Sequence, residues 1–264
     1  KQLRIIHVAP FYHPVIGGVE MVVKKIAEYM AGKGNETYVL TYNRPRNNGV
    51  SFLPKEETVN NVQVVRLKPN LTWSYGTYST ELLQTLRKLR PDLVHVHVWR
   101  HPHVFQVARL KEQMNFTAVL HTHSPFLMFS QLGIGTWLYH RAVDLLEKKT
   151  LRRYDKTIAL TPHEKRIVTK KLGVPHEQVE VIPNGIDDQL ADLSRCRTTS
   201  GPAVLYLGRI SRQKNVRLLI EAMRHARRRP VVPKLMMAGP DEGFVARLRR
   251  DANRYSLDLK YFGI

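Results

Sequence analysis

The stretch LYLGRISRQKN, residues Leu205–Asn215, decides the fold. The apolar run Ala203–Leu207 predicts a buried strand, and Gly208 permits a tight exit at its end. A strand, a tight turn and a helix in this order form the repeating unit of an open α/β sheet. The residues that follow have the spacing of one apolar helix face; they are Val216, Leu219, Ile220 and Met223.

Two cations lie in the predicted turn. Arg209 and Lys214 stand between the carboxyl end of the strand and the amino end of the helix. Ligands of open α/β sheets bind at this end, and a helix amino terminus favours anions. A guanidinium fork beside a mobile ammonium group suits a diphosphate, whose charge is spread over two neighbouring phosphorus centres. A solvated basic loop is the plain alternative, because the chain is rich in arginine.

The amino-terminal segment repeats the same arrangement. Leu3–Ala9 predicts a buried strand, Pro10–Gly18 a loop, and the apolar stripe between Val19 and Met30 a helix. The pair Gly17–Gly18 would let backbone N–H groups at the helix start approach a ligand. On the glycines alone, a tight turn without a ligand is the simpler interpretation.

Strands and helices alternate over the rest of the chain, which predicts parallel βαβ units. We expect an α/β protein with two Rossmann-like, doubly wound domains: residues 1–188, a linker at residues 189–202, and residues 203–264. Lys68–Gly76 is expected to be a loop. Further strands are expected at Thr37–Tyr42, Val62–Leu67, Asp92–Val98, Thr117–Leu120, Lys156–Leu160, Val179–Ile182, Lys234–Ala238 and Leu259–Phe262. Further helices are expected near Ser79–Leu89, Pro102–Met114, Gly135–Arg153, Pro162–Leu172 and Glu242–Tyr255.

Six histidines are candidate metal ligands. They are His95, His97, His101, His103, His121 and His123. His95 and His97 fall on one face of a predicted strand, so two imidazoles could share a zinc ion. Against zinc, no cysteine accompanies them, and the nearest acid is Asp92.

Several strings resemble the motifs of one protein family. Gly-Arg-Ile-x-x-x-Lys after a strand resembles the donor-diphosphate loop of retaining glycosyltransferases with the GT-B fold, glycosyltransferase family 4. The strings P-x-x-G-G-V-E, D-L-V-H-V-H, T-H-S-P and V-I-P-N-G-I-D resemble further motifs of that family, and V-I-P-N-G-I-D precedes the Arg/Lys loop as it does in the family. The resemblance covers the whole chain and explains the histidines without a metal.

The resemblance implies roles for individual residues. Arg209 and Lys214, with Gly208 beside them, would hold the diphosphate of a nucleotide sugar and neutralise the leaving group. His123 would form a hydrogen bond to the donor sugar, with His121 as its competitor for that role. Gly17 and Gly18 would face the donor phosphates and the acceptor, and the role of Glu20 in that motif stays open. The segment with Asn184, Gly185 and Asp187 would lie at the mouth of the interdomain cleft.

The implied activity is that of a retaining hexosyltransferase that moves sugar from a nucleotide-sugar donor to an acceptor. Such enzymes stabilise the departing nucleoside diphosphate electrostatically and need neither a metal nor another cofactor for it. Asn215 stands where the family usually has glycine, a minor departure because Asn tolerates unusual backbone angles.

The second domain is expected to be incomplete. Nothing in the chain matches the family's segment with two glutamates seven residues apart. We therefore expect a piece of a longer enzyme, inactive by itself, or a sugar-nucleotide-binding subunit that a second chain completes. A sheet that ends at Leu259–Ile264 should leave an unpaired edge and an uncovered apolar face.

Composition indicates the partners. The formal net charge is +20, which attracts nucleotide diphosphates, nucleic acid or an anionic membrane surface. Nucleic acid is not expected, because no recognition module is present. The expected acceptor is a glycan or a lipid-linked molecule. A basic, leucine-bearing helix at Arg141–Arg153 suggests peripheral attachment to the inner membrane face. The single cysteine, Cys196, and the lack of a signal-peptide pattern suggest the cytoplasm.

Overall fold

A computed structural model describes most of the chain in two compact units. The first unit comprises Lys1–Phe126 and Tyr139–Gly185, and the second Leu127–Leu138 and Ile186–Ile264. The predicted linker at residues 189–202 lies almost wholly outside the described residues, so the domain boundaries stay a prediction. The described residues are 1–44, 53–73, 76–123, 133–186, 201–228 and 232–263.

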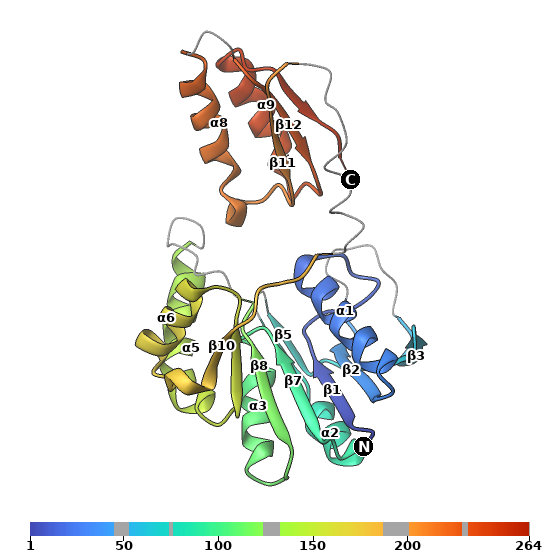
Figure 1. Cartoon of the computed structure of the whole chain (residues 1–264). Helices are drawn as coiled ribbons and strands as arrows, with labels where there is room; N and C mark the ends of the chain where they lie inside the picture. Colours follow the sequence, from blue (N-terminus) through green and yellow to red (C-terminus); the bar gives the residue numbers. More distant parts are fainter. Residues whose placement is uncertain (45–52, 74–75, 124–132, 187–200, 229–231, 264) are drawn as a thin grey trace. The chain divides into compact units, whose positions relative to one another are not determined.

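An eight-stranded sheet forms the centre of the first unit (Figure 1). All neighbouring strands are parallel except β3, which is antiparallel to β4. In spatial order the strands are β10 (Val179–Val181), β9 (Lys156–Ala159), β8 (Thr117–His121), β7 (Leu93–His97), β1 (Arg4–Val8), β2 (Glu36–Tyr42), β4 (Val62–Leu67) and β3 (Glu56–Val59). The predicted parallel strands of this unit are confirmed.

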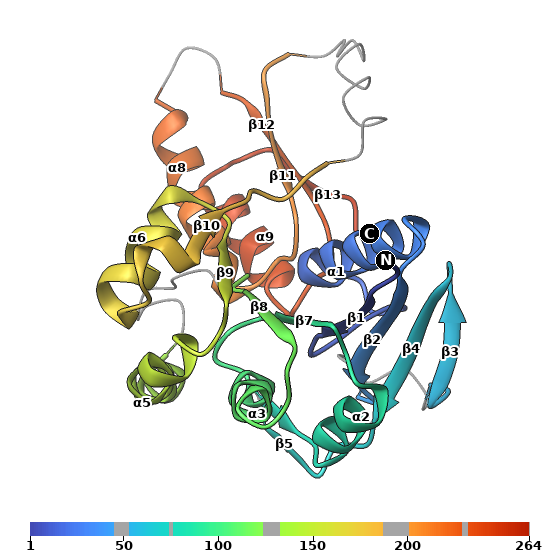
Figure 2. The same cartoon turned by 60° about the horizontal axis from the view of Figure 1, so that its bottom comes forward.

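The sheet is doubly wound. The chain runs outward from β1 through β2 to β4, and then from β7 in the other direction to β10, so the strand order reverses between β1 and β7. Helix α1 lies on one face, and α2 and α3 lie on the other (Figures 1 and 2). A reversal of this kind marks the ligand-binding end of an open α/β sheet. The helices are α1 (Gly18–Gly32), α2 (Glu81–Leu89), α3 (Pro102–Lys111), α5 (Ile134–Leu151) and α6 (Pro162–Leu172).

One strand of this unit was missed, and one sequence prediction is wrong. Strand β3, with the sequence EETV, was not expected, because its outward residues are polar and its strand pattern is short. The expected loop Lys68–Gly76 contains β5 (Leu71–Trp73), which pairs with β6 (Gly76–Tyr78) as an antiparallel hairpin. β3 is an edge strand of the main sheet, and β5 and β6 form a separate two-stranded sheet. Such short strands carry little apolar pattern in the sequence.

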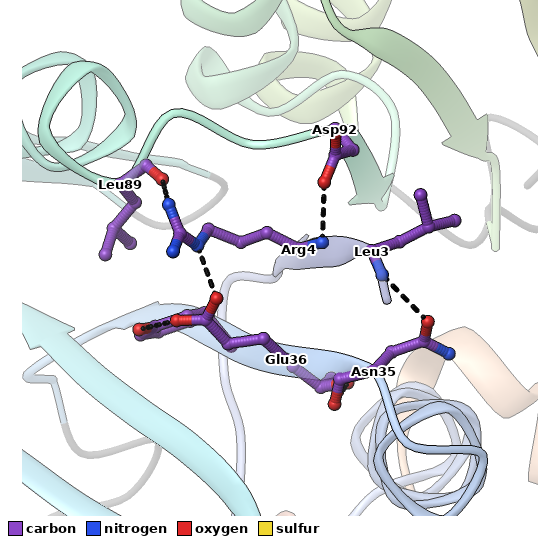
Figure 3. A network of polar contacts seen from close by, with 8 residues as sticks. Leu3, Arg4, Asn35, Glu36, Leu89 and Asp92 are labelled. Carbon is purple, nitrogen blue, oxygen red and sulfur yellow. Dashed lines mark hydrogen bonds and ion pairs between the residues drawn. The ribbon is translucent and has the colours of Figure 1, made fainter. Parts of the chain in front are cut away.

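Polar contacts of Arg4 join three strands at the amino-terminal end of the sheet (Figure 3). Its Nε donates to Glu36 Oε2 at 2.7 Å, and its Nη1 donates to the carbonyl oxygen of Leu89. Its backbone N–H donates to Asp92 Oδ2 at 2.7 Å. These contacts hold β1, β2 and the start of β7 in register, at the end of the sheet away from the strand ends that carry the histidines.

The second unit has a three-stranded parallel sheet in the order β11 (Ala203–Leu207), β12 (Lys234–Ala238), β13 (Leu259–Tyr261). Helices α8 (Val216–Ala226) and α9 (Val245–Arg254) pack on one face, where residues such as Leu235 and Met237 are buried.

The other face of this sheet is apolar and open. Leu205 is 66% exposed and Leu207 is 79% exposed. The predicted burial of the strand Ala203–Leu207 is therefore wrong for these residues, because both described helices cover the same face. The uncovered apolar face that was expected for an incomplete second domain is present, and β13 is an edge strand.

Candidate functional site

The turn after β11 has the conformation that its sequence demands. Gly208 has a φ of +147°, outside the range of ordinary side-chain-bearing residues. Asn215 adopts the left-handed conformation, with φ +50° and ψ +39°, immediately before α8. This conformation favours glycine and tolerates asparagine, which accounts for Asn215 at a position where glycine is usual. Backbone hydrogen bonds from Gly208 to Ala238 and from Ile210 to Pro240 hold the turn beside the end of β12.

The two cations of this turn have different surroundings. Arg209 Nη1 lies 2.8 Å from Glu242 Oε1, in a half-exposed ion pair. Lys214 lies in a short 3-10 turn, Arg212–Lys214, is exposed, and has no ion-pair partner among the described residues. One guanidinium with remaining donors and one free ammonium group thus stand before the amino end of α8. This arrangement can bind a phosphate-bearing ligand.

The first glycine turn leaves the amino end of α1 accessible. Gly17 is extended and precedes the helix, and no side chain caps the first turn. A Cβ placed on Gly18 would meet no atom within 4 Å, so the backbone here is open to a ligand. Glu20 is buried in the first turn of α1. The predicted strand, glycine turn and helix are therefore in place, with N–H groups at the helix start.

Five buried imidazoles gather near the carboxyl ends of β1, β7 and β8. His7 lies beside His95 in the parallel register, and His97 lies beside His121. His7 Nδ1 is 3.1 Å from His97 Nε2, and His97 Nδ1 is 3.0 Å from His123 Nε2. His7, His97 and His123 therefore form a chain of hydrogen-bonded rings that leads from the sheet interior to the turn after β8.

These rings are neutral at pH 7. Burial lowers the pKa of His7 and of His121 to about 4, and that of His123 to about 3. Burial, with repulsion from neighbouring rings, holds the pKa values of His95 and His97 well below the ordinary value. The cluster can form hydrogen bonds and ligate a metal, but it offers no positive charge to a phosphate.

His101 and His103 belong to a separate set. His103 Nε2 donates to the carbonyl oxygen of His97 at 2.8 Å, and His101 Nε2 accepts from the backbone N–H of Thr77 at 3.2 Å. Both rings therefore hold the start of α3 to its neighbours. His7 takes their place in the cluster, although the sequence patterns did not indicate it. The signal that could have found it is its position near the end of β1, the strand next to β7.

Glu164 holds the turn that follows β8. Its carboxylate accepts from the hydroxyl of Thr122 and from the backbone N–H of Leu160. Its own N–H donates to Thr161 Oγ1 at 3.1 Å, which caps α6. Thr122 stands between His121 and His123, so this buried network fixes the backbone on which both imidazoles are carried.

The remaining predicted residues are less constrained. Asn184 and Gly185 are described and exposed, after the end of β10. Asp187 lies outside the described residues, as does the S-P part of T-H-S-P. Of the predicted set, the first unit carries Gly17, Gly18, Glu20, His121, His123, Asn184 and Gly185, and the second unit carries Gly208, Arg209 and Lys214.

Residues 16–190 match the family described as Glycosyltransferase Family 4. The chain belongs to this family. An uncharacterized glycosyltransferase of Methanocaldococcus jannaschii is 26% identical over 79% of this chain and 56% of its own length. A glycogen synthase of Mycobacterium tuberculosis is 24% identical over 90% of this chain and 61% of its own length. This chain thus spans about three fifths of the length of these relatives.

Solved glycosyltransferase structures share its fold. A sucrose-phosphate synthase from Thermosynechococcus elongatus aligns with a TM-score of 0.69 at 21% identity, over 99% of this chain and 70% of that one. The Anabaena protein HepE, solved with UDP and glucose, aligns with a TM-score of 0.63 at 16% identity, over 100% of this chain and 70% of that one. The fold is therefore GT-B, and the partial coverage agrees with an incomplete second domain.

Proposed function

We propose that this chain carries the donor-diphosphate loop of a retaining glycosyltransferase that moves a sugar from a nucleotide sugar to an acceptor hydroxyl. The observation that carries the proposal is the turn Gly208–Asn215, which places Arg209 and Lys214 between the end of β11 and the start of α8. Membership of Glycosyltransferase Family 4 supports it. HepE, which shares the fold, was solved with UDP-glucose.

The chemistry of transfer explains why two cations are needed. The bond between the anomeric carbon and the diphosphate oxygen breaks, and a new bond forms to the acceptor oxygen on the same face of the sugar. The acceptor proton leaves with the diphosphate, whose negative charge grows as the bond breaks. Arg209 and Lys214 stabilise that charge. Electrostatic stabilisation by positioned groups of this kind is commonly the largest single contribution to an enzyme's rate enhancement. No metal or other cofactor takes part in this step of the proposal.

Neutral histidines suit a positioning role toward the sugar. His123, in the turn after β8, would donate or accept a hydrogen bond to a donor-sugar hydroxyl, and His121 would support the same substrate. The low pKa of His123, about 3, results from burial and makes it a poor general base at pH 7. We further assign Gly17, Gly18 and Glu20 to substrate binding in the first unit. Asn184, Gly185 and Asp187 are assigned to the mouth of the substrate cleft.

Nucleotide binding tests the proposal directly. The chain is titrated calorimetrically with UDP, GDP and ADP, and with the corresponding nucleotide sugars. Binding of at least one nucleoside diphosphate, weakened when Arg209 or Lys214 is replaced, is expected. Absence of binding to all of them, with the protein folded, would exclude a donor-binding role. A tighter, salt-sensitive affinity for DNA or RNA would instead favour a nucleic-acid-binding protein.

A second candidate is a sugar-nucleotide-binding subunit that a further polypeptide completes. The observation that favours it is the open sheet face of the second unit, where Leu205 and Leu207 are exposed. In this case the chain binds nucleotide but transfers no sugar by itself, and adding the completing polypeptide restores transfer. Robust transfer by these 264 residues alone would rule this candidate out.

A lipid-linked or membrane-proximal acceptor is also proposed, with the protein in the cytoplasm at the inner membrane face. On α5, Leu145 and Leu146 are exposed, next to exposed Lys148 and Lys149. Apolar side chains beside cations suit an anionic lipid surface. Among the described residues, no helix is long and apolar enough to cross a membrane.

A further inference from the structure

Three of the buried imidazoles have no part in the proposed transfer reaction. His7 on β1 and His95 and His97 on β7 are each less than 10% exposed, and they point to the same face of the sheet. One ring nitrogen of each lies within 4.8 Å of one ring nitrogen of each of the other two. Three convergent imidazoles are the kind of group that holds a metal ion in proteins.

Hydrogen bonding within the protein leaves this triad incomplete. His7 Nε2 and His95 Nε2 have no hydrogen-bond partner among the described residues. A buried polar atom without a partner is unfavourable. The chain of hydrogen-bonded rings through His97 gives no partner to His95 Nε2, although the two ring centroids lie only 4.1 Å apart. A metal ion bound in the cluster would give this nitrogen a partner.

We propose that His7, His95 and His97 bind one divalent transition-metal ion of the Zn²⁺, Co²⁺ or Ni²⁺ class. Imidazole nitrogen suits these ions, whereas Mg²⁺ and Ca²⁺ prefer oxygen ligands. A metal ion bound by His7 Nδ1 and His97 Nε2 would replace the hydrogen bond between these two nitrogens. Their separation of 3.1 Å is close to the value of about 3.3 Å expected for two ligands of a tetrahedral zinc ion. Three neutral ligands leave the charge of the ion uncompensated, so the affinity is lower than that of a thiolate site.

The second ring nitrogen of His97 gives the metal a consequence outside the triad. Metal-bound imidazoles usually donate their other N–H to a neighbouring acceptor, which fixes the tautomer. With His97 Nε2 on the metal, its Nδ1–H donates to His123 Nε2 at 3.0 Å. His123 then carries its proton on Nδ1, so this nitrogen can donate a hydrogen bond to an acceptor on a bound ligand. The buried triad therefore positions His123 without touching substrate.

Cobalt titration of the full chain tests the proposal. The protein is dialysed against a chelator and titrated with Co²⁺, whose visible absorption reports nitrogen ligation. One Co²⁺ per chain is expected, displaced by Zn²⁺ and not by Mg²⁺. His7→Phe and His95→Phe keep an aromatic ring but remove both nitrogens, and each should weaken Co²⁺ binding at least tenfold. The matched control is His103→Phe, which removes a buried imidazole outside the triad and should leave Co²⁺ affinity unchanged.

A second measurement does not depend on the folding of the variants. X-ray absorption of the zinc-loaded wild-type chain should show three imidazole nitrogens at about 2.0–2.1 Å. Failure of the folded wild-type chain to bind Co²⁺ or Zn²⁺ would overturn the proposal, as would fewer than three imidazoles around the ion. Equal affinity in folded His7→Phe and His95→Phe proteins would do the same. No nucleotide is present in these experiments, so their outcome is independent of donor binding.

Discussion

Arg209 Nη1 lies 2.8 Å from Glu242 Oε1, so the guanidinium group that we assign to the donor diphosphate is already paired with a carboxylate. Both side chains are partly exposed, and such pairs contribute about 0.2–1 kcal/mol. A diphosphate must compete with Glu242 or share Arg209 with it. Glu242→Gln should therefore raise nucleoside diphosphate affinity, by up to about fivefold. Calorimetric titration measures this, and a weaker affinity would show that Glu242 orients Arg209 for binding.

Removal of either loop cation should weaken nucleotide binding. Hydrogen bonds to charged groups contribute about 1.5–3 kcal/mol, so Arg209→Ala and Lys214→Ala should each lower affinity by about 10- to 100-fold. The matched control is Arg224→Ala, which removes an exposed cation from the last turn of the following helix, away from its amino end. Unchanged nucleotide affinity in both loop variants would contradict the assignment, and an equal loss in the control would indicate a general charge effect.

Membrane attachment should depend on the exposed end of α5. The variant Leu145→Ser/Leu146→Ser and the variant Lys148→Glu/Lys149→Glu should each reduce co-flotation with anionic vesicles at low salt, because each cation contributes about 1 kcal/mol near such a surface. The control Lys170→Ala/Lys171→Ala removes two exposed cations from α6 and should float like the wild-type chain. Absence of wild-type enrichment on these vesicles would remove the membrane from the proposal.

Substitutions on the two faces of the second sheet should change different properties: self-association for the open face, and stability for the helix-covered face. Leu205→Ser/Leu207→Ser changes exposed residues and should reduce self-association in sedimentation experiments while leaving stability nearly unchanged. Leu235→Ala, on the helix-covered face, should lower the free energy of unfolding by about 2–5 kcal/mol. A wild-type chain that stays monomeric at all concentrations would argue against an adhesive open face.

Acid should weaken the contacts of Arg4 at the amino-terminal end of the first sheet. Hydrogen bonding to Arg4 and Tyr38 lowers the pKa of Glu36 below its ordinary value. A lowered folded-state pKa stabilises the protein above the unfolded value, near 4.5, and this contribution is lost as the pH falls through the folded value. Urea unfolding between pH 3 and 6 should therefore show a smaller pH dependence in Glu36→Gln than in wild type. Identical slopes would show that this pair does not contribute.

Local sequence patterns were sufficient for most of the architecture. Alternation of apolar strands with periodic helices predicted the parallel sheets, and Gly208 and Asn215 predicted a special turn before α8. These features depend on residues within one turn or one strand, so the local sequence is sufficient to predict them. The polar strand β3 and the hairpin β5–β6 were missed, because little apolar surface is buried there and the sequence carries little period.

Only the tertiary structure decided which histidines meet. Proximity along the chain groups His101 and His103 with His95 and His97. In the structure, parallel pairing places His7 beside His95 across 88 residues, while His101 and His103 serve the start of α3. Neighbours in a parallel sheet come from distant segments, so their register depends on packing of the whole domain. The pairing of Arg209 with Glu242 likewise depends on the sheet, because the turns after the neighbouring strands β11 and β12 lie side by side. Leu205 and Leu207 lie on the open face because α8 and α9 both pack on the other side.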